Sequence, residues 1–482
     1  MNKRVWAGIL ILTVAFSTFY ANRKITMHNR SKIIRVALPG KIPEGQLSPE
    51  NISTIALYHL HYNLWDTLIT SDQSAAVARS FRMSPDNLTI SFEIDPDVKF
   101  SNGRSITSAD VKFAFERIMA REENGHINAK SVIRKITAAS PTELQIELSA
   151  PTPSFLFLLT TPEFGIVPKE ALDGAGNVAS LSVTSGAYTV AKADTTSQIV
   201  HLVRNKFFQR AVPNAPEEVE IYFLKNLGTG SSLGDYDFVE VRNSDAEQIV
   251  SQAEEKGFAY KATVPSVSVF LVADTNHVSS EQAKYIAQAF RDNFRFETPR
   301  SFETRSHQFF PEKTFGSLSR QEIPAIPTAK SSPKLPDEIV ISNSRSTGPL
   351  GEAVSRVFSQ IGAKVRFVES DSKKPIHYIF TSQGMNTDYP EIELHLDTVG
   401  PYADFNATDE IKRLVNLATH EANDAKRSEI IKTVGREFLS SGKIVPLTVR
   451  AYVHLFRPTR VDLNNITTYD GDIPFYKLKV PE

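Results

Sequence analysis

Hydrophobic and polar side chains follow two different patterns along this chain, which predicts a mixture of strands and helices. Residues 32–38 form a largely apolar run that ends at Pro39 and Gly40, a pattern typical of a buried strand. Residues 88–94 alternate between apolar and polar side chains, which predicts a strand with one face in the core. Residues 52–64 predict a helix. Because such elements follow one another without internal repeats, we expect an α/β chain.

Turn and capping signals mark where some of these elements begin. Asn87 precedes the alternating strand and tolerates a left-handed backbone better than most residues do. Residues 102–103 read Asn-Gly, a turn signal. Thr107 and Asp110 have the spacing of a capping box, in which the Thr107 hydroxyl caps the helix and Asp110 accepts a hydrogen bond from the Thr107 amide. The capping box predicts a helix over residues 108–119.

Length and composition narrow the class of protein. The chain has 482 residues, more than one hydrophobic core normally serves, so we expect two or more lobes. Its 54 basic and 55 acidic residues give a formal net charge of -1, which argues against nucleic acid as a partner. The chain has no cysteine. This excludes disulfides, a thiolate nucleophile, cysteine-ligated zinc, iron–sulfur clusters and the lipid anchor of a bacterial lipoprotein.

The first 21 residues have the layout of an export signal. Lys3 and Arg4 form a basic start, and a mostly apolar run follows over residues 5–21. This run is shorter than the roughly 20 apolar residues that a spanning helix needs. Small residues at 15–17 and at Ala21 offer two cleavage positions, and retention as an N-terminal anchor is the alternative. Either route predicts a periplasmic or other extracytoplasmic location for the rest of the chain.

Segment 79–117 carries an ordered series of motifs. They are R-S-F at 79–81, S-P-D-N-L-T-I-S-F at 84–92, V-K-F-S-N-G at 98–103, I-T-S-A-D-V at 106–111 and F-E-R at 115–117. This series resembles the signature of extracytoplasmic solute-binding protein family 5, the oligopeptide-, dipeptide- and nickel-binding proteins of ABC transporters. A long ordered string of this kind is more specific than any single short motif.

The resemblance covers most of residues 33–480 and is thin between about 225 and 335. Further segments that resemble the family are the turn at 185–188, the strand and turn at 202–208, the helix and strand at 354–367, the loop at 383–390 and the terminal helices at 411–447. The loop at 383–390 resembles the family's G-W-x-A-D-Y loop. Met385 stands where the family has tryptophan, which puts the shape of the ligand, and its class, in doubt.

The resemblance implies a fold of the periplasmic-binding-protein type II, cluster C: two lobes joined by a hinge, with an extra inserted domain. The implied domains are domain I (32–62, 166–262 and 447–482), domain II as the insertion (63–165) and domain III (263–446). The hinge segments would lie near residues 263–267 and 444–449. A ligand would bind in the cleft between the lobes and be enclosed when they close.

The same resemblance suggests which residues meet the ligand. Asp388 matches the family aspartate that binds the positive amino terminus of a peptide, and a buried ammonium needs such a carboxylate. The alternative is that Asp388 only caps the turn before Pro390. The neighbouring Gly384, Met385, Asn386 and Tyr389 would form the same part of the site.

Two residues near the implied hinge are further ligand-binding candidates. Phe270 follows the first hinge segment and Tyr452 follows the second. Each would line the cleft, and a place in the core is the alternative for Phe270. His59 and His61 would share a face on a strand and could then bind a metal, but on the expected helix they point apart. We therefore expect both histidines at surface or partly buried helix positions and predict no metal site.

The resemblance implies a binding protein without cofactor or catalytic residues. It would bind peptides in the interlobe cleft and deliver them to the permease subunits of an ABC importer, and it would be a monomer. Nickel complexes, sugars and other small solutes are alternative ligands, because one fold hosts several functions. An anchored solute sensor and, more remotely, a hydrolase are alternative functions on the same fold.

Overall fold

The computed structural model describes most of the chain. The described residues are 33–42, 48–49, 52, 54–120, 129–225, 233–242, 246–326, 332–343, 348–369, 375–399, 407–466 and 473–481. The predicted export segment at residues 1–21 therefore lies outside the described residues. Within the described part, no helix combines the length and the apolar character that crossing a membrane requires.

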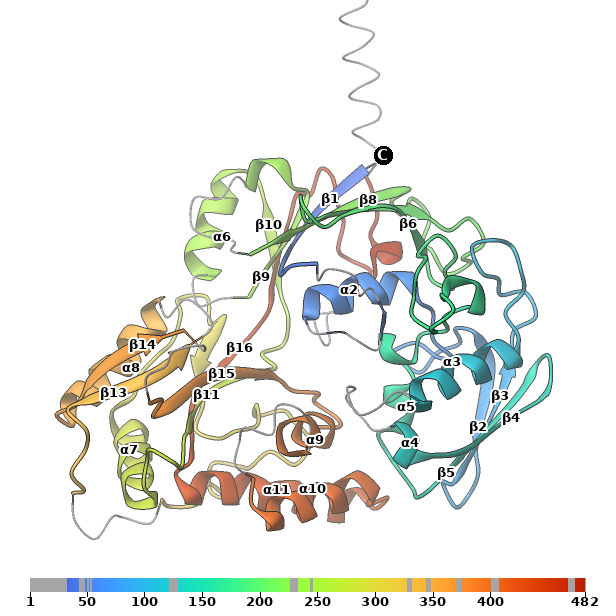
Figure 1. The fold of residues 1–482 in the computed structure, drawn as a ribbon. Helices are drawn as coiled ribbons and strands as arrows, with labels where there is room; N and C mark the ends of the chain where they lie inside the picture. The colour runs from blue at the N-terminus through green and yellow to red at the C-terminus, as the bar shows by residue number, and fades with distance from the viewer. Residues whose placement is uncertain are drawn as a thin grey trace, which may run out of the picture.

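Three β-sheets, each with its own helices, divide the described chain into three regions (Figure 1). Region I has a seven-stranded sheet in the order β10-β17-β9-β1-β8-β7-β6 and carries the helices α2 (Ile55–Leu64) and α6 (Ala246–Glu255). The central β1 pairs in parallel with both β8 and β9. The strands of this sheet are β1 (Ile33–Pro39), β6 (Tyr188–Asp194), β7 (Ile199–Arg204), β8 (Glu218–Leu224), β9 (Phe238–Val241), β10 (Ala259–Ala262) and β17 (Val453–Phe456).

Region II is built on a four-stranded antiparallel sheet in the order β2-β3-β5-β4. Apolar side chains on one face of β3 and β5 alternate with exposed ones on the other, so this sheet buries one face against helices. Its elements are β2 (Ala78–Met83), β3 (Thr89–Ile94), α3 (Ser108–Ala120), α4 (Ala129–Val132), β4 (Ile133–Ser140), β5 (Glu143–Leu148) and α5 (Phe155–Leu158).

Region III has a six-stranded mixed sheet in the order β12-β16-β11-β15-β13-β14. All seven residues of β11 are buried, as expected for a central strand covered on both faces. Its elements are β11 (Val267–Ala273), α7 (Ser280–Asn293), β12 (Glu303–Arg305), β13 (Glu338–Asn343), α8 (Gly348–Gln360), β14 (Lys364–Val368), β15 (Tyr378–Gly384), α9 (Glu391–Val399), α10 (Asp409–His420), α11 (Asp424–Ser441) and β16 (Ile444–Arg450).

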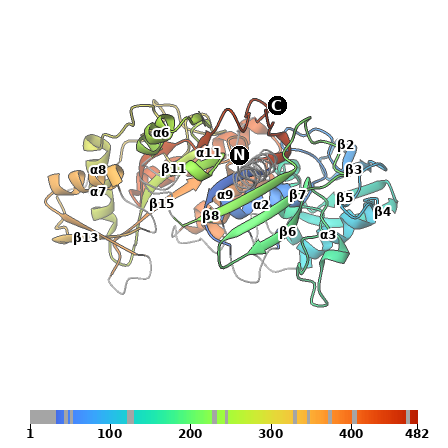
Figure 2. The same ribbon diagram turned by 90° about the horizontal axis from the view of Figure 1, so that it is seen from above.

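Regions II and III lie at opposite ends of the molecule in both views (Figures 1 and 2). The chain passes from region I to region III between β10 and β11, and it returns between β16 and β17. These two crossings pair with each other, because the Thr263 amide donates to the Tyr452 carbonyl and the Tyr452 amide donates to the Thr263 hydroxyl, both at 2.9 Å. The return crossing lies at residues 451–452, after the predicted hinge at 444–449, since β16 occupies 444–450.

The α/β architecture with two lobes and an inserted region agrees with the predicted fold class. The sheet of region I draws on three separated parts of the chain, in the order expected for domain I. The sheet of region III continues to Arg450, beyond the predicted domain boundary at residue 446. The domain boundaries themselves remain our proposal.

The structure confirms the predicted turn at Asn87 and one of the two predicted capping bonds at the start of α3. Asn87 has a φ of 57°, as its place in the turn predicted. The Thr107 amide donates to Asp110 Oδ2 at 2.9 Å, so that half of the capping box is present. The Thr107 hydroxyl does not cap the helix but donates to the same carboxylate at 2.7 Å, and Arg104 also pairs with Asp110 at 2.9 Å. The expected cap uses the Thr107 hydroxyl oxygen as the acceptor of a helix amide, whereas here the hydroxyl is oriented as a donor to the neighbouring charged carboxylate.

The start of region II depends on a close approach of two backbone segments. A Cβ on Gly186 would lie 2.5 Å from the carbonyl carbon of Leu64 and 2.7 Å from the carbonyl oxygen of Asn63. The Gly186 amide also donates to the Leu64 carbonyl at 2.9 Å. Only glycine therefore fits between α2 and this turn.

We predict that Gly186→Ala lowers the free energy of unfolding by about 1–3 kcal/mol, because the added methyl group must push backbone atoms apart. Urea denaturation followed by circular dichroism measures the change. Gly174→Ala is the matched control, since nothing lies within 4 Å of its added Cβ. Equal denaturation midpoints for the two variants would show that the backbones do not meet as described.

Candidate ligand-binding site

Two of the predicted site residues lie together where regions I and III join. Gly384 ends β15, and Tyr452 lies on the return crossing. The Tyr452 hydroxyl is 3.4 Å from the position that a Cβ on Gly384 would occupy. The guanidinium of Arg242, just after β9 in region I, lies 4.8 Å from the centre of the Tyr452 ring. The phenol of Tyr452 and the guanidinium of Arg242 thus lie next to Gly384, which has no side chain, where regions I and III join.

Arg242 is held by a buried ionic network in region I. Its Nε donates to Glu240 Oε1, and one of its terminal nitrogens lies 3.0 Å from His59 Nε2. His59 Nε2 is also 3.0 Å from Glu240 Oε2, and both of these side chains are fully buried. The Arg242 side chain itself is 12% exposed, so its position is fixed before any ligand arrives.

Burial and charge oppose each other at Glu240. Burial alone would raise the pKa of its carboxyl, but the Arg242 charge and the His59 contact outweigh burial and hold the pKa far below its usual range. Burial lowers the pKa of His59, so the imidazole is neutral at pH 7. Arg242 and Glu240 therefore form an ion pair with a neutral histidine beside it.

The structure corrects the expected exposure of the two histidines on α2. His59 is 0% and His61 is 1% exposed, whereas surface or partly buried positions were expected. His61 Nδ1 accepts a hydrogen bond at 3.1 Å from the Nε1 of Trp65, which lies one helical turn further along the chain. The described residues contain no group of three or more carboxylate and histidine side chains placed to hold a metal ion.

The loop at 384–390 is closed by Asn386. Its side-chain oxygen accepts hydrogen bonds from the backbone amides of Asp388 at 2.9 Å and Tyr389 at 2.8 Å. The turn-capping role that was the alternative for Asp388 thus falls to Asn386 among the bonds of the described residues. Asp388 is exposed, so its carboxylate is open to solvent in this structure.

Tyr389, at the other end of this loop, lies against region II. Its ring centre is 6.0 Å from that of Phe157 in region II, and the Arg427 guanidinium lies 5.0 Å from the Tyr389 ring. Tyr389 therefore meets region II, whereas Gly384 meets the hinge. The loop at 384–390 therefore runs from the hinge to the contact with region II.

Met385 and Phe270 pack inside region III. They are 2% and 1% exposed and belong to one apolar cluster with Phe309 and Phe310. The ring centres of Phe270 and Phe309 are 4.9 Å apart. This packing fits the core alternative that was given for Phe270. The ligand contacts of Met385, Phe270 and the other predicted site residues remain predictions.

Sequence reasoning missed Arg242 and its network. The signal available was Glu240, a carboxylate in the middle of the apolar run Phe-Val-Glu-Val that forms β9. A charge inside a buried strand requires a partner. The partner His59 lies 181 residues away in the sequence, so no local pattern connects the two.

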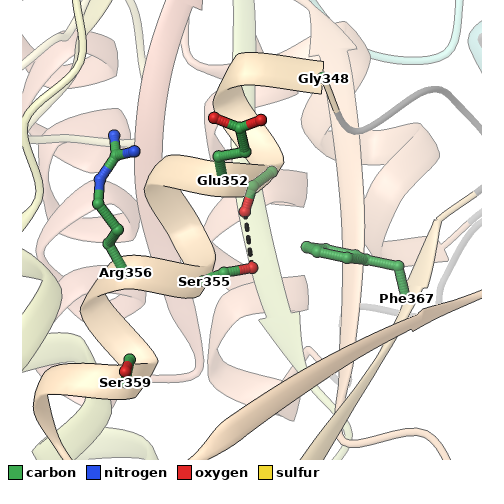
Figure 3. A pocket seen from close by; sticks show the side chains of 7 residues that line it. Gly348, Glu352, Ser355, Arg356, Ser359 and Phe367 are labelled. Atoms are coloured by element: carbon green, nitrogen blue, oxygen red, sulfur yellow. Dashed lines mark hydrogen bonds between the residues drawn. The ribbon is translucent and has the colours of Figure 1, made fainter.

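A hollow on the surface of region III lies elsewhere. It runs along α8, has a volume of about 520 Å³ and is open to solvent (Figure 3). Its lining residues are Gly348, Gly351, Glu352, Ser355, Arg356, Ser359 and Phe367. Ser355 donates its hydroxyl to the Gly351 carbonyl at 2.9 Å. The hollow contains none of the predicted site residues, and α8 lies at the outer end of region III (Figure 1).

Comparison with solved structures identifies the fold. The chain superposes on DppA, an ABC transporter-associated periplasmic binding protein from Helicobacter pylori in complex with the peptide STSA. The TM-score is 0.75 at 16% identity, and the match covers 95% of this chain and 100% of that one. NikA from Brucella suis, in complex with Fe(III)-EDTA, gives a TM-score of 0.76 at 17% identity over 93% of this chain and 100% of that one. The fold is that of the type II periplasmic binding proteins.

Sequence comparison finds a matching family model and relatives over part of the chain. Residues 73–293 match the family model described as bacterial extracellular solute-binding proteins, family 5 Middle. A Brucella ovis protein that carries the provisional name of an ABC transporter peptide-binding protein is 28% identical over 188 residues, 37% of this chain and 35% of that protein. A dipeptide-binding protein from Lactococcus lactis is 24% identical over 234 residues, 43% of this chain and 40% of that protein.

These findings agree with the resemblance of the motifs at 79–117 to family 5, and the family match covers 221 of the 482 residues of the chain. The matches span less than half the length of these two relatives.

The buried network predicts a loss of stability in acid. Burial lowers the pKa of His454, on β17 beside Glu240, to about 4. Between pH 6.5 and 4 the unfolded chain therefore binds a proton that the folded chain does not, so stability falls as the pH falls. The loss approaches about 1.4 kcal/mol per pH unit from this residue alone.

Urea denaturation at pH 7.5 and pH 5 measures this loss. His454→Asn removes the titrating group, and we expect the variant to lose less stability between the two pH values than the wild type. His277→Asn changes a partly exposed histidine in region III and is the control. An unchanged pH dependence in His454→Asn would refute the assignment.

Proposed function

We propose that this chain is the substrate-binding component of an ABC importer. It binds peptides or similar small solutes between the lobes and delivers them to a membrane permease. The match to family 5 supports this, as do the relatives whose names assign them to peptide binding. The family also supports a location outside the cytoplasm and a binding role without catalysis. We propose that the protein acts as a monomer and contacts the permease through its closed face.

The observation that carries the proposal is the pair of crossings between regions I and III. Only residues 263–266 and 451–452 separate the strands of the two sheets there. Two paired segments of this length form a hinge about which two lobes can close on a solute. The loop at 384–390 begins at this hinge and ends against region II, so closure brings it over any solute in the cleft.

Asp388 is the residue we propose for the charged end of a peptide. Its carboxylate is exposed in this structure, so a bound ammonium can reach it and pair with it. A solute bound between the lobes would cover this carboxylate and take both groups out of water together. A solute without a cationic group would cover the carboxylate and leave it unpaired, which costs several kcal/mol. Such a solute is therefore disfavoured.

Native mass spectrometry of the protein purified from its own host tests the function. We expect a co-purifying mass that fragments as a peptide. The same experiment separates binding from hydrolysis. Residues 230–234 read G-S-S-L-G, which is the spacing of a serine-hydrolase elbow, and a hydrolase would not release the peptide intact. A non-peptide mass, or none, would contradict the proposed ligand class.

We predict that Asp388→Asn weakens peptide binding by at least about tenfold, or about 1.4 kcal/mol, because the ammonium loses its counter-charge. Isothermal titration calorimetry with a peptide identified from the purified protein measures the affinity. Glu410→Gln is the matched control, since Glu410 is an exposed carboxylate of region III that pairs only with Arg413 among the described bonds. Equal affinities of Asp388→Asn and the wild type, with equal melting temperatures, would exclude the assignment.

A further inference from the structure

A second contact between the lobes lies away from the hinge. Here α9 and α10 of region III face α4 and α5 of region II (Figure 1). His420 Nδ1, at the end of α10, lies 3.2 Å from the Pro151 carbonyl and 3.4 Å from the Thr152 hydroxyl. Ile392 of α9 is 3% exposed and belongs to the apolar core cluster of region II. We call this contact the interlobe seam.

The interlobe seam encloses a small polar cavity. Its volume is about 40 Å³, and residues of both lobes line it, among them Ser154 of region II and Glu391, His395 and His420 of region III. A cavity of this size holds a few water molecules and no peptide. It exists only while the lobes are together, because each lobe supplies one wall.

Glu391 brings an incompletely paired carboxyl group to this cavity. The residue is 1% exposed, and its Oε1 accepts from Arg427 at 2.8 Å. Its Oε2 is buried without a hydrogen-bond partner among the described residues. The Ser154 hydroxyl, across the interlobe seam, is fully buried and has no such partner either. An ionised oxygen without a partner is costly here, whereas a protonated one can donate to an acceptor in the cavity.

We propose that the interlobe seam is a proton-controlled latch, in which protonation of Glu391 favours the closed arrangement of regions II and III. The latch acts on the protein without solute. It therefore goes beyond solute delivery. Through the latch, the pH outside the cell sets the fraction of solute-free protein that is closed.

The direction of the effect follows from the groups around Glu391. Burial raises the pKa of Glu391 to about 7; Arg427 of α11 opposes this shift, and Asp424 of α11 adds to it. Opening exposes the carboxyl and returns its pKa towards 4.5, so the closed form binds this proton more tightly. Closure through Glu391 is therefore favoured at acidic pH, is lost as the pH rises to about 7, and changes little above that.

The histidines of the seam limit the latch on the acid side. Burial lowers the pKa of His395, and the neighbouring His420 adds to this. Protonated His395 therefore opposes closure below its usual value of about 6.5. The side chains that region II contributes to the cavity, Ser131, Val132 and Ser154, carry no charge. The two effects oppose each other below pH 6.5, so closure should pass through a maximum in mildly acidic solution.

Fluorescence resonance energy transfer on the full chain without solute tests the latch. Because the chain has no cysteine, Ser91→Cys in region II and Glu437→Cys in region III provide two unique labelling positions, both exposed in the wild type. We expect the ratio of closed to open protein to fall about twofold or more between pH 6 and pH 8, because the loss through Glu391 exceeds the gain from deprotonation of His395. In Glu391→Gln this fall should disappear, and the ratio should rise between pH 6 and pH 8 as His395 loses its proton.

Glu410→Gln in the same labelled background is the control and should follow the wild type. His395→Asn should lose the decline of closure below pH 6 and show a steeper decline between pH 6 and pH 8 than the wild type. A wild-type ratio that does not change between pH 6 and pH 8 would overturn the latch, even if Glu391→Gln fails to fold. A Glu391→Gln profile identical to that of the wild type would overturn it too. Because no solute is present, neither result bears on solute delivery.

Discussion

The paired crossings between the two large sheets are the constraint on which the rest of the structure depends. The ladder of β10 and β17 continues through Thr263 and Tyr452 into the ladder of β11 and β16, so one two-stranded ribbon runs from region I into region III. Each strand of this ribbon is anchored in a buried sheet at both ends. Bending is therefore concentrated in the few residues between the sheets, and the lobes can move as rigid bodies.

Two buried carboxylates, one beside this ribbon and one at the interlobe seam, differ in how well they are paired. Beside the ribbon, both oxygens of Glu240 contact His59 or Arg242. At the interlobe seam, only one oxygen of Glu391 has a hydrogen-bond partner among the described residues. A carboxylate paired through both oxygens keeps its charge in place, and a partly paired one responds to its surroundings.

Features that depend on neighbouring residues were predicted correctly from the sequence, and features that depend on other contacts were not. The alternating run at 88–94, the left-handed Asn87 and the helix after Thr107 were predicted because each depends on neighbours a few residues away. The capping of α3 was wrong in one bond because Arg104 and the Thr107 hydroxyl share the Asp110 carboxylate. The loop at 384–390 was found by its motif, but its closure by Asn386 was not.

The sequence by itself determined the resemblance to family 5, the mixed α/β fold and the position of the candidate loop, since ordered motifs and hydrophobic patterns are properties of contiguous residues. Tertiary structure alone decided that Arg242 reaches Tyr452, that His59 meets Glu240 and that Glu391 meets Arg427. These partners are up to 210 residues apart. Their contacts depend on which strands pair and how the lobes meet, and a buried charge can be read only once its surroundings are known.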